Sequence, residues 1–182
     1  MSASDRTGRW ARALAVPTAL GLAALVSACG SSSTTAGGMS CPPLVAAPGT
    51  ATIAIFPAGG TKVPVVGGRI NGAQARCQRD KTGVAVNTEI NFYAERINLQ
   101  IKDATLPYFI ALVDPQEHVL AQEGFQLHVV FNPGENYRKL PPEKLTIHLP
   151  VRDRAVAADY SVIIGFQLTP EQLAFNRAAL AH

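Results

Sequence analysis

The alternation of apolar and polar side chains between Val84 and Glu95 constrains the fold of this chain more than any other feature. Successive side chains of a β-strand point to opposite faces of its sheet, so a period of two predicts a strand with one buried face and one face in water. The apolar face carries Val84, Val86, Ile90, Phe92 and Ala94, and the polar face carries Asn87, Glu89, Asn91 and Glu95.

Six further segments have the length and composition of strands, and turn residues such as Pro57–Gly60, Asp80–Gly83 and Asn132–Gly134 separate them. They are Ala51–Phe56, Arg69–Gln78, Tyr108–Val113, Val119–Phe131, Leu145–Leu149 and Tyr160–Leu168. Because Pro64 cannot donate to a sheet, residues 63–66 are expected to form an edge strand or a loop. About seven short strands without βαβ alternation predict an all-β fold, an antiparallel immunoglobulin-like β-sandwich.

The end of the chain has a different pattern. Thr169-Pro170-Glu171-Gln172 has the residues of a helix start: a Thr cap, a Pro at the first helical position and a Gln three residues after the cap. Glu171 and Arg177 suit the positive and negative ends of a helix dipole. A short C-terminal helix that ends near Leu180 is therefore predicted.

The first 28 residues have the pattern of an export signal. Arg6, Arg9 and Arg12 precede an apolar segment, residues 13–28, that ends in small side chains. A basic region followed by such a segment is typical of a secretory signal peptide, and the segment is shorter than the ~20 apolar residues of a membrane span. An uncleaved N-terminal anchor is the alternative.

Val26-Ser27-Ala28-Cys29 follows the apolar segment directly and resembles the lipobox of bacterial lipoproteins. The resemblance implies removal of residues 1–28 and lipidation of Cys29, and two or more hydrophobic signals suffice for stable membrane attachment. It also implies the periplasmic face of the outer membrane, because Gly30 stands where an Asp would retain a lipoprotein in the inner membrane. The inner membrane is the alternative location.

Residues 29–40 are rich in Gly, Ser and Thr and carry no charge, which predicts a flexible tether ahead of a β-sandwich domain over residues 41–182. Without residues 1–28 the chain has 13 basic and 12 acidic side chains. A nearly neutral surface offers no electrostatic basis for binding nucleic acid, so no nucleic-acid partner is expected. The predicted attachment to the membrane depends on the lipid on Cys29.

Three cysteines leave one pair once Cys29 is assigned to the lipid anchor. Cys41 and Cys77 are then predicted to form a disulfide, because exported proteins reach an oxidising compartment. The bond would close a loop of about 36 residues, which the chain-entropy model values at about 4 kcal/mol. Two unpaired thiols are the alternative.

No catalytic motif stands out, and no catalytic residue, metal or cofactor is predicted. The chain lacks Gly-x-Ser-x-Gly, Ser-x-x-Lys and His-Glu-x-x-His. His128 and His148 would offer metal ligands only if their strands were neighbours, and no third ligand is visible. Glu89 and Glu95 have the residue type of a glycoside-hydrolase pair, although a solvated strand face explains them more simply.

A contact surface is predicted from residue type and position. Tyr93 is an aromatic side chain on the polar face of its strand, which can mark a binding surface. The terminal helix supplies the other candidates. The predicted contact residues are Tyr93, Thr169, Gln172, Phe175 and Arg177.

Cys41-Pro42, Cys77 just before Asp80, and the ending Gly165–Gln172 followed by Asn176-Arg177 resemble a group of uncharacterised proteobacterial lipoproteins. The resemblance supports the disulfide and the fold and implies no activity. The expected function is a non-enzymatic interaction or assembly module in the periplasm, with an envelope protein complex as its partner. Two alternatives are a binding module for a small ligand, lipid or glycan, and a hydrolase with an unrecognised site.

Overall fold

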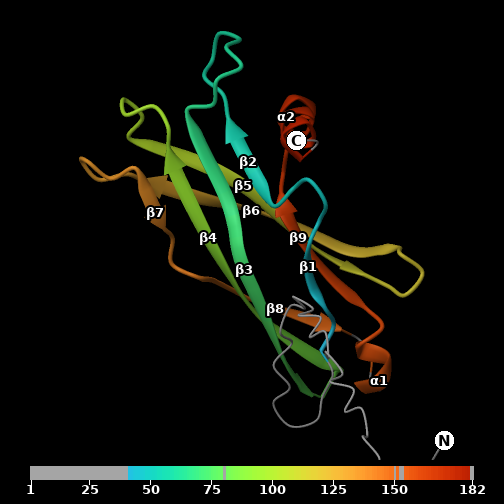
Figure 1. The fold of residues 1–182 in the computed structure, drawn as a ribbon. Helices are drawn as coiled ribbons and strands as arrows, with labels where there is room; N and C mark the ends of the chain where they lie inside the picture. Colours follow the sequence, from blue (N-terminus) through green and yellow to red (C-terminus); the bar gives the residue numbers. More distant parts are fainter. Residues whose placement is uncertain (1–40, 80, 150, 152–153, 181–182) are drawn as a thin grey trace, which may run out of the picture. The chain divides into compact units, whose positions relative to one another are not determined.

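The computed structural model describes residues 41–79, 81–149, 151 and 154–180. The predicted signal peptide, the lipidation site Cys29 and the tether lie outside these residues. The described residues form nine strands and two helices, and the strands make two sheets that pack as a β-sandwich (Figure 1). No helix within these residues is long and apolar enough to cross a membrane.

The first sheet has four strands in the order β1-β9-β5-β6. Its members are β1 (Leu44–Ala46), β9 (Ser161–Phe166), β5 (Asp103–Val113) and β6 (Val119–Val130). The β5–β6 and β5–β9 pairs are antiparallel, whereas β1 pairs with β9 in parallel. The first sheet is therefore antiparallel except at the β1–β9 pair.

The second sheet has five strands in the order β2-β3-β4-β7, and β8 also pairs with β4. Its members are β2 (Thr52–Ile55), β3 (Val66–Arg79), β4 (Val84–Arg96), β7 (Tyr137–Lys139) and β8 (Glu143–Leu149). Leu140, Pro141 and Pro142 separate β7 from β8. Because prolines cannot donate to the ladder, two short strands take the place of one long partner for β4.

The predicted all-β sandwich with a short C-terminal helix is confirmed, and the alternation in β4 places its apolar face in the core. Two of the nine strands, β1 and β7, have only three residues each and were not predicted. The helices are α1 (Arg154–Ala157) and α2 (Pro170–Leu180). The second of these is the helix that the Thr-Pro-Glu-Gln motif predicted.

Aromatic rings from both sheets meet in the middle of the core. Phe92 of β4 lies 5.0 Å from Tyr108 of β5 and 5.8 Å from Phe166 of β9, measured between ring centroids. All three side chains are at most 1% exposed. Large buried rings contribute much of the apolar area of a core, so these contacts hold the two sheets together.

The predicted disulfide between Cys41 and Cys77 is confirmed, with the two Cα atoms 5.6 Å apart. Cys77 lies on β3, and Cys41 precedes β1. The bond therefore joins the start of the domain, which β1 ties to the first sheet, to a long strand of the second sheet.

The strands of the two sheets run in clearly different directions, so the sheets do not cover each other completely (Figure 1). The turn that joins β5 to β6 extends past the strands of the second sheet on one side. The burial pattern agrees, because Val119–Gly124 at the start of β6 is exposed whereas Leu127 and Val129 near its end are buried.

Candidate functional site

Helix α2 lies against the free edge of β2 and is held there by two side-chain amides. The Gln172 amide donates to the carbonyl of Ala54 at 2.8 Å, and the Asn176 amide donates to the carbonyl of Thr52 at 2.7 Å. Residues four apart share one face of a helix, so both amides meet the same strand. These bonds place Phe175, the residue before Asn176, beside the outer face of the sheet.

The first turn of α2 is a capping box, as predicted. The backbone N–H of Gln172 donates to the hydroxyl oxygen of Thr169 at 3.2 Å, and the backbone N–H of Thr169 donates to the side-chain oxygen of Gln172 at 2.8 Å. Gln172 thus caps the helix and holds β2 at the same time. Two backbone donors that would otherwise lack partners at the helix start are satisfied.

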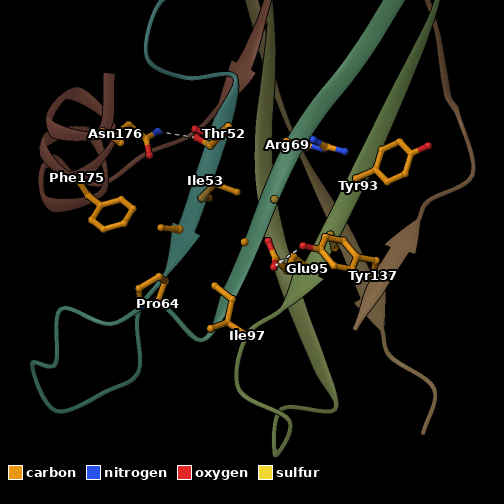
Figure 2. Close-up of a pocket in the computed structure, with 15 residues that line it drawn as sticks. Thr52, Ile53, Pro64, Arg69, Tyr93, Glu95, Ile97, Tyr137, Phe175 and Asn176 are labelled. Carbon is orange, nitrogen blue, oxygen red and sulfur yellow. Dashed lines mark hydrogen bonds between the residues drawn. The ribbon is translucent and has the colours of Figure 1, made fainter. Parts of the chain in front are cut away.

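A groove crosses the outer face of the second sheet because small residues lie beside α2. Ala54, Gly67, Glu95 and Tyr137 are direct partners across β2, β3, β4 and β7. Ala54 carries only a methyl group and Gly67 carries no side chain, so the surface is low at these two positions. Phe175 bounds this low region on one side and Tyr137 bounds it on the other (Figure 2).

The groove has a volume of about 390 Å³. Its walls are mainly apolar and aromatic, and Figure 2 shows Pro64 and Ile97 at one end. Phe175 is 39% exposed and Tyr137 is 64% exposed, so both rings are open to contact from outside. A second hollow, lined in part by Val63 and Leu99, shares Pro64 and Ile97 with the groove and extends the apolar surface.

Two charged groups lie in the groove, and an aromatic ring orients each of them. The guanidinium carbon of Arg69 lies 5.2 Å from the centroid of the Tyr93 ring. The Tyr137 hydroxyl donates to a carboxylate oxygen of Glu95 at 2.7 Å, and this bond raises the pKa of Tyr137. Among the described residues Arg69 has no ion-pair partner, so its charge is available to a ligand.

The structure brings two of the five predicted contact residues together in this groove. Tyr93 and Phe175 both line it, although they are far apart in the sequence. Thr169 and Gln172 instead form the helix cap, and Gln172 is only 9% exposed. Arg177 lies on α2 and is not part of the groove lining.

Sequence reasoning missed Tyr137, Arg69, Ile97 and Pro64 as groove residues. Tyr137 lies in the short strand β7, and the bond from its hydroxyl to Glu95 joins residues 42 positions apart. Arg69 lies in a strand that was predicted, but its place beside Tyr93 depends on the register between β3 and β4. The local signal that the sequence offered was a Tyr three residues after the Asn132-Pro133-Gly134 turn.

The candidate metal and carboxylate pairs are not assembled. His128 lies on β6 of the first sheet and His148 on β8 of the second, so their strands are not neighbours. No group of three metal-ligating side chains occurs in the described part of the chain. Glu89 and Glu95 are six residues apart on β4, which at a strand rise of ~3.3 Å per residue is about 20 Å, and a glycosidase pair needs ~5–9 Å.

Comparison with protein-family models, with curated proteins and with solved structures finds no match to this chain. The resemblance to proteobacterial lipoproteins therefore stays a prediction from the sequence. The groove and the N-terminal motif are the two features of the chain that point to a function.

Proposed function

We propose that this chain is a lipid-anchored protein of the bacterial cell envelope that acts as a non-enzymatic interaction module, and that the groove beside α2 is its contact surface. One observation carries the proposal. Tyr93, Tyr137 and Phe175 come from β4, β7 and α2, and they line a single open groove.

The composition of the groove suits a protein partner. Aromatic residues and Arg are enriched at protein–protein interfaces, and Tyr and Arg are among the residues that contribute most to binding. Three aromatic side chains and Arg69 lie within this one groove. Because Arg69 lacks an ion-pair partner among the described residues, a partner that presents a carboxylate beside an apolar side chain would complement both features.

The apolar surface beyond the groove supports a macromolecular partner rather than a small one. Val63 is 68% exposed, Leu99 is 61% exposed and Ile97 is 45% exposed, and all three line the hollow next to the groove. Contiguous exposed apolar residues of this kind mark interaction sites in soluble domains. A partner that filled the groove would also cover these side chains.

The proposed location follows from the N-terminal motif. Lipidation of Cys29 would attach the domain to a membrane, and the outer membrane is the proposed site because Gly30 follows the lipidated residue. The disulfide between Cys41 and Cys77 is consistent with an oxidising compartment such as the periplasm. A partner would then be another envelope protein.

Site-specific photo-crosslinking in cells tests the proposal. A photoreactive amino acid in place of Tyr93 or Phe175 should give one crosslinked envelope protein in nearly stoichiometric yield. The same amino acid in place of Gln78, an exposed position on β3 that lines neither the groove nor the β6 edge, is the matched control and should give none. Equal crosslinking from all three positions, or only abundant neighbours from the groove, would contradict the proposal.

A small ligand or glycan is the second candidate, and the volume of the groove favours it. About 390 Å³ falls within the range of ~300–1,000 Å³ that is typical of small-molecule sites. The result expected for a small ligand differs from the result expected for a protein partner. The purified chain would bind a glycan or small molecule in solution, and Phe175→Ala would abolish that binding although no protein is captured in cells.

A further inference from the structure

The sandwich is open on the side where β6 and β8 end their sheets, away from the groove beside α2. Each of these strands pairs on one side only among the described strands. Side chains at odd positions of β6 face the core, as buried Leu127 and Val129 show. Ala121 and Glu123 face the same way but are exposed, so nothing in the described part of the chain covers the inner surface of the sheet there.

A cleft of about 490 Å³ lies between the two sheets on this open side. Its apolar lining comes from the face of each strand that points to the core along the remainder of that strand. Ile110 and Leu112 come from β5, Phe125 from β6, and Leu145 and Ile147 from β8. The Phe125 ring stacks on Tyr108 of the core at 5.1 Å between centroids, so the cleft is continuous with the aromatic centre of the sandwich.

The geometry of the cleft fits an extended chain better than a compact ligand. An unpaired edge strand presents a row of backbone N–H and C=O groups, and an added strand satisfies them. Its alternate side chains would then point into the cleft, at the period of two that Leu145 and Ile147 show on β8. A lipid chain would fill the apolar space but leave the backbone groups of the strand edges unpaired.

The charge at the cleft indicates what the added chain carries. Glu123 is exposed, lines the cleft and has no ion-pair partner in the residues that the structure describes. The neighbouring cation on β8, Lys144, points to the other face of its sheet, where its amine lies 4.0 Å from Glu89. A basic side chain on the incoming strand would therefore complement Glu123.

We propose that this cleft receives an extended segment of a partner polypeptide, with apolar side chains at alternate positions and a basic residue opposite Glu123, which completes the sandwich on its open side. The site is separate from the groove beside α2 and does not depend on the function proposed for it. Strand addition of this kind derives affinity from backbone hydrogen bonds and specificity from pockets for alternate side chains.

Binding of designed strand peptides to the purified full-length chain tests the proposal. The probes are four fluorescent nonapeptides that alternate valine or leucine with threonine, each with one lysine at an apolar position, and the readout is fluorescence anisotropy. We expect at least one probe to bind saturably. The same peptide with proline at its centre should not bind, because proline removes a backbone donor and disrupts strand pairing.

Two exposed positions on β6 provide a matched pair of variants. Ala121→Trp places a large ring in the cleft, whereas Gln126→Trp places the same ring on the opposite face of the strand. We expect Ala121→Trp to weaken peptide binding at least tenfold and Gln126→Trp to leave it within twofold. Equal thermal unfolding midpoints would show that both variants fold.

A charge reversal tests the predicted basic residue. Glu123→Lys should weaken binding of the lysine-containing peptide several-fold and should not weaken binding of a peptide with valine in place of the lysine.

Binding that Ala121→Trp leaves unchanged, or no binding by any of the four peptides, would overturn the proposal. Palmitate that binds the cleft where the peptides do not would assign it to a lipid. Self-association through the cleft without peptide binding would assign it to a second copy of the chain.

Discussion

The side-chain amide of Asn176 in α2 donates a hydrogen bond to the backbone carbonyl of Thr52 in β2 at 2.7 Å. The same amide also donates to the carbonyl of Gly49 at 2.9 Å. An uncovered edge strand is a template for unwanted pairing, and covering it with a helix is one of the ways in which proteins prevent this. The terminal helix therefore has two roles, since it closes the β2 edge and supplies Phe175 to the groove.

We expect Asn176→Ala to destabilise the fold by about 1–3 kcal/mol, because the carbonyls of Gly49 and Thr52 would lose a buried hydrogen-bond donor. Urea unfolding followed by circular dichroism measures the change. The exposed neighbour Arg177 is the control, and Arg177→Ala should change the free energy of unfolding by less than about 0.5 kcal/mol. Equal effects of the two substitutions would show that the amide does not hold the strand.

Two adjacent glycines face opposite sides of β3 and should respond differently to the same change. A methyl group on Gly68 would lie 2.8 Å from side-chain carbons of both Ile53 and Leu106, whereas one on Gly67 would have its nearest neighbours at 3.9 Å. Gly68→Ala should therefore destabilise the fold by about 1–3 kcal/mol through overpacking of the core.

Gly67→Ala should leave stability nearly unchanged, and thermal unfolding of both variants checks the difference. Gly67→Leu goes further, because it fills the floor of the groove without entering the core. Crosslinking from the Tyr93 position should be lost in this variant if the groove is the contact surface. A destabilised Gly67→Ala together with a stable Gly68→Ala would mean that the register of β3 is not the one described.

Replacement of Cys41 and Cys77 by Ser should lower the free energy of unfolding by about 2–5 kcal/mol, the range typical of disulfides in small domains. Thermal unfolding with and without a reductant measures it. Reductant should lower the unfolding midpoint of the parent chain and leave that of the double Ser variant unchanged.

Cys29→Ser is a matched control for the loss of a thiol, and it should not change the unfolding midpoint. It should also release the protein from membranes, and continued attachment would contradict the proposed anchor.

The Tyr108 hydroxyl makes the free energy of unfolding depend on pH in the alkaline range. Burial, with a smaller contribution from the nearby carboxylate of Glu143, raises the pKa of the Tyr108 hydroxyl well above its ordinary value. The folded state thus holds this proton more tightly than the unfolded state does. Its contribution to stability is complete below the unfolded pKa of about 10 and is lost as the pH rises above it.

We expect the free energy of unfolding to fall above about pH 10 by up to ~1.4 kcal/mol per pH unit from this group. Urea unfolding at a series of alkaline pH values measures the slope. Tyr108→Phe removes the proton and should make the slope shallower. A slope that this substitution leaves unchanged would assign the alkaline loss of stability to other groups.

Local sequence patterns predicted several features of the fold. The alternation in β4 identified which side chains are buried, and the Thr-Pro-Glu-Gln motif located the start of α2. Both patterns depend on residues a few positions apart, so they can be read without knowledge of the rest of the chain. The predicted disulfide depended on the compartment that the N-terminal motif implies.

Local sequence patterns did not determine the register between strands. Whether Arg69 lies beside Tyr93, and whether Gly67 or Gly68 faces the core, depends on a bulge in β3 between Ile70 and Ala73 and on pairing with a distant strand. A shift of one residue would exchange the faces of the whole strand. The groove therefore could not be predicted, although two of its aromatic residues were identified as candidates.

The sequence alone determined the longer strands and the terminal helix of this protein, because hydrophobic period, turn residues and helix caps act over a few residues, whereas the short elements β1, β7 and α1 carry no such pattern. The tertiary structure decided which surfaces those elements share. It brought Tyr93 and Phe175 into one groove and placed His128 and His148 in different sheets. It also left the inner face of β6 exposed at Ala121 and Glu123 among the residues that the structure describes. These outcomes depend on strand order, register and the crossing of the two sheets, which are set by contacts between residues far apart in the chain.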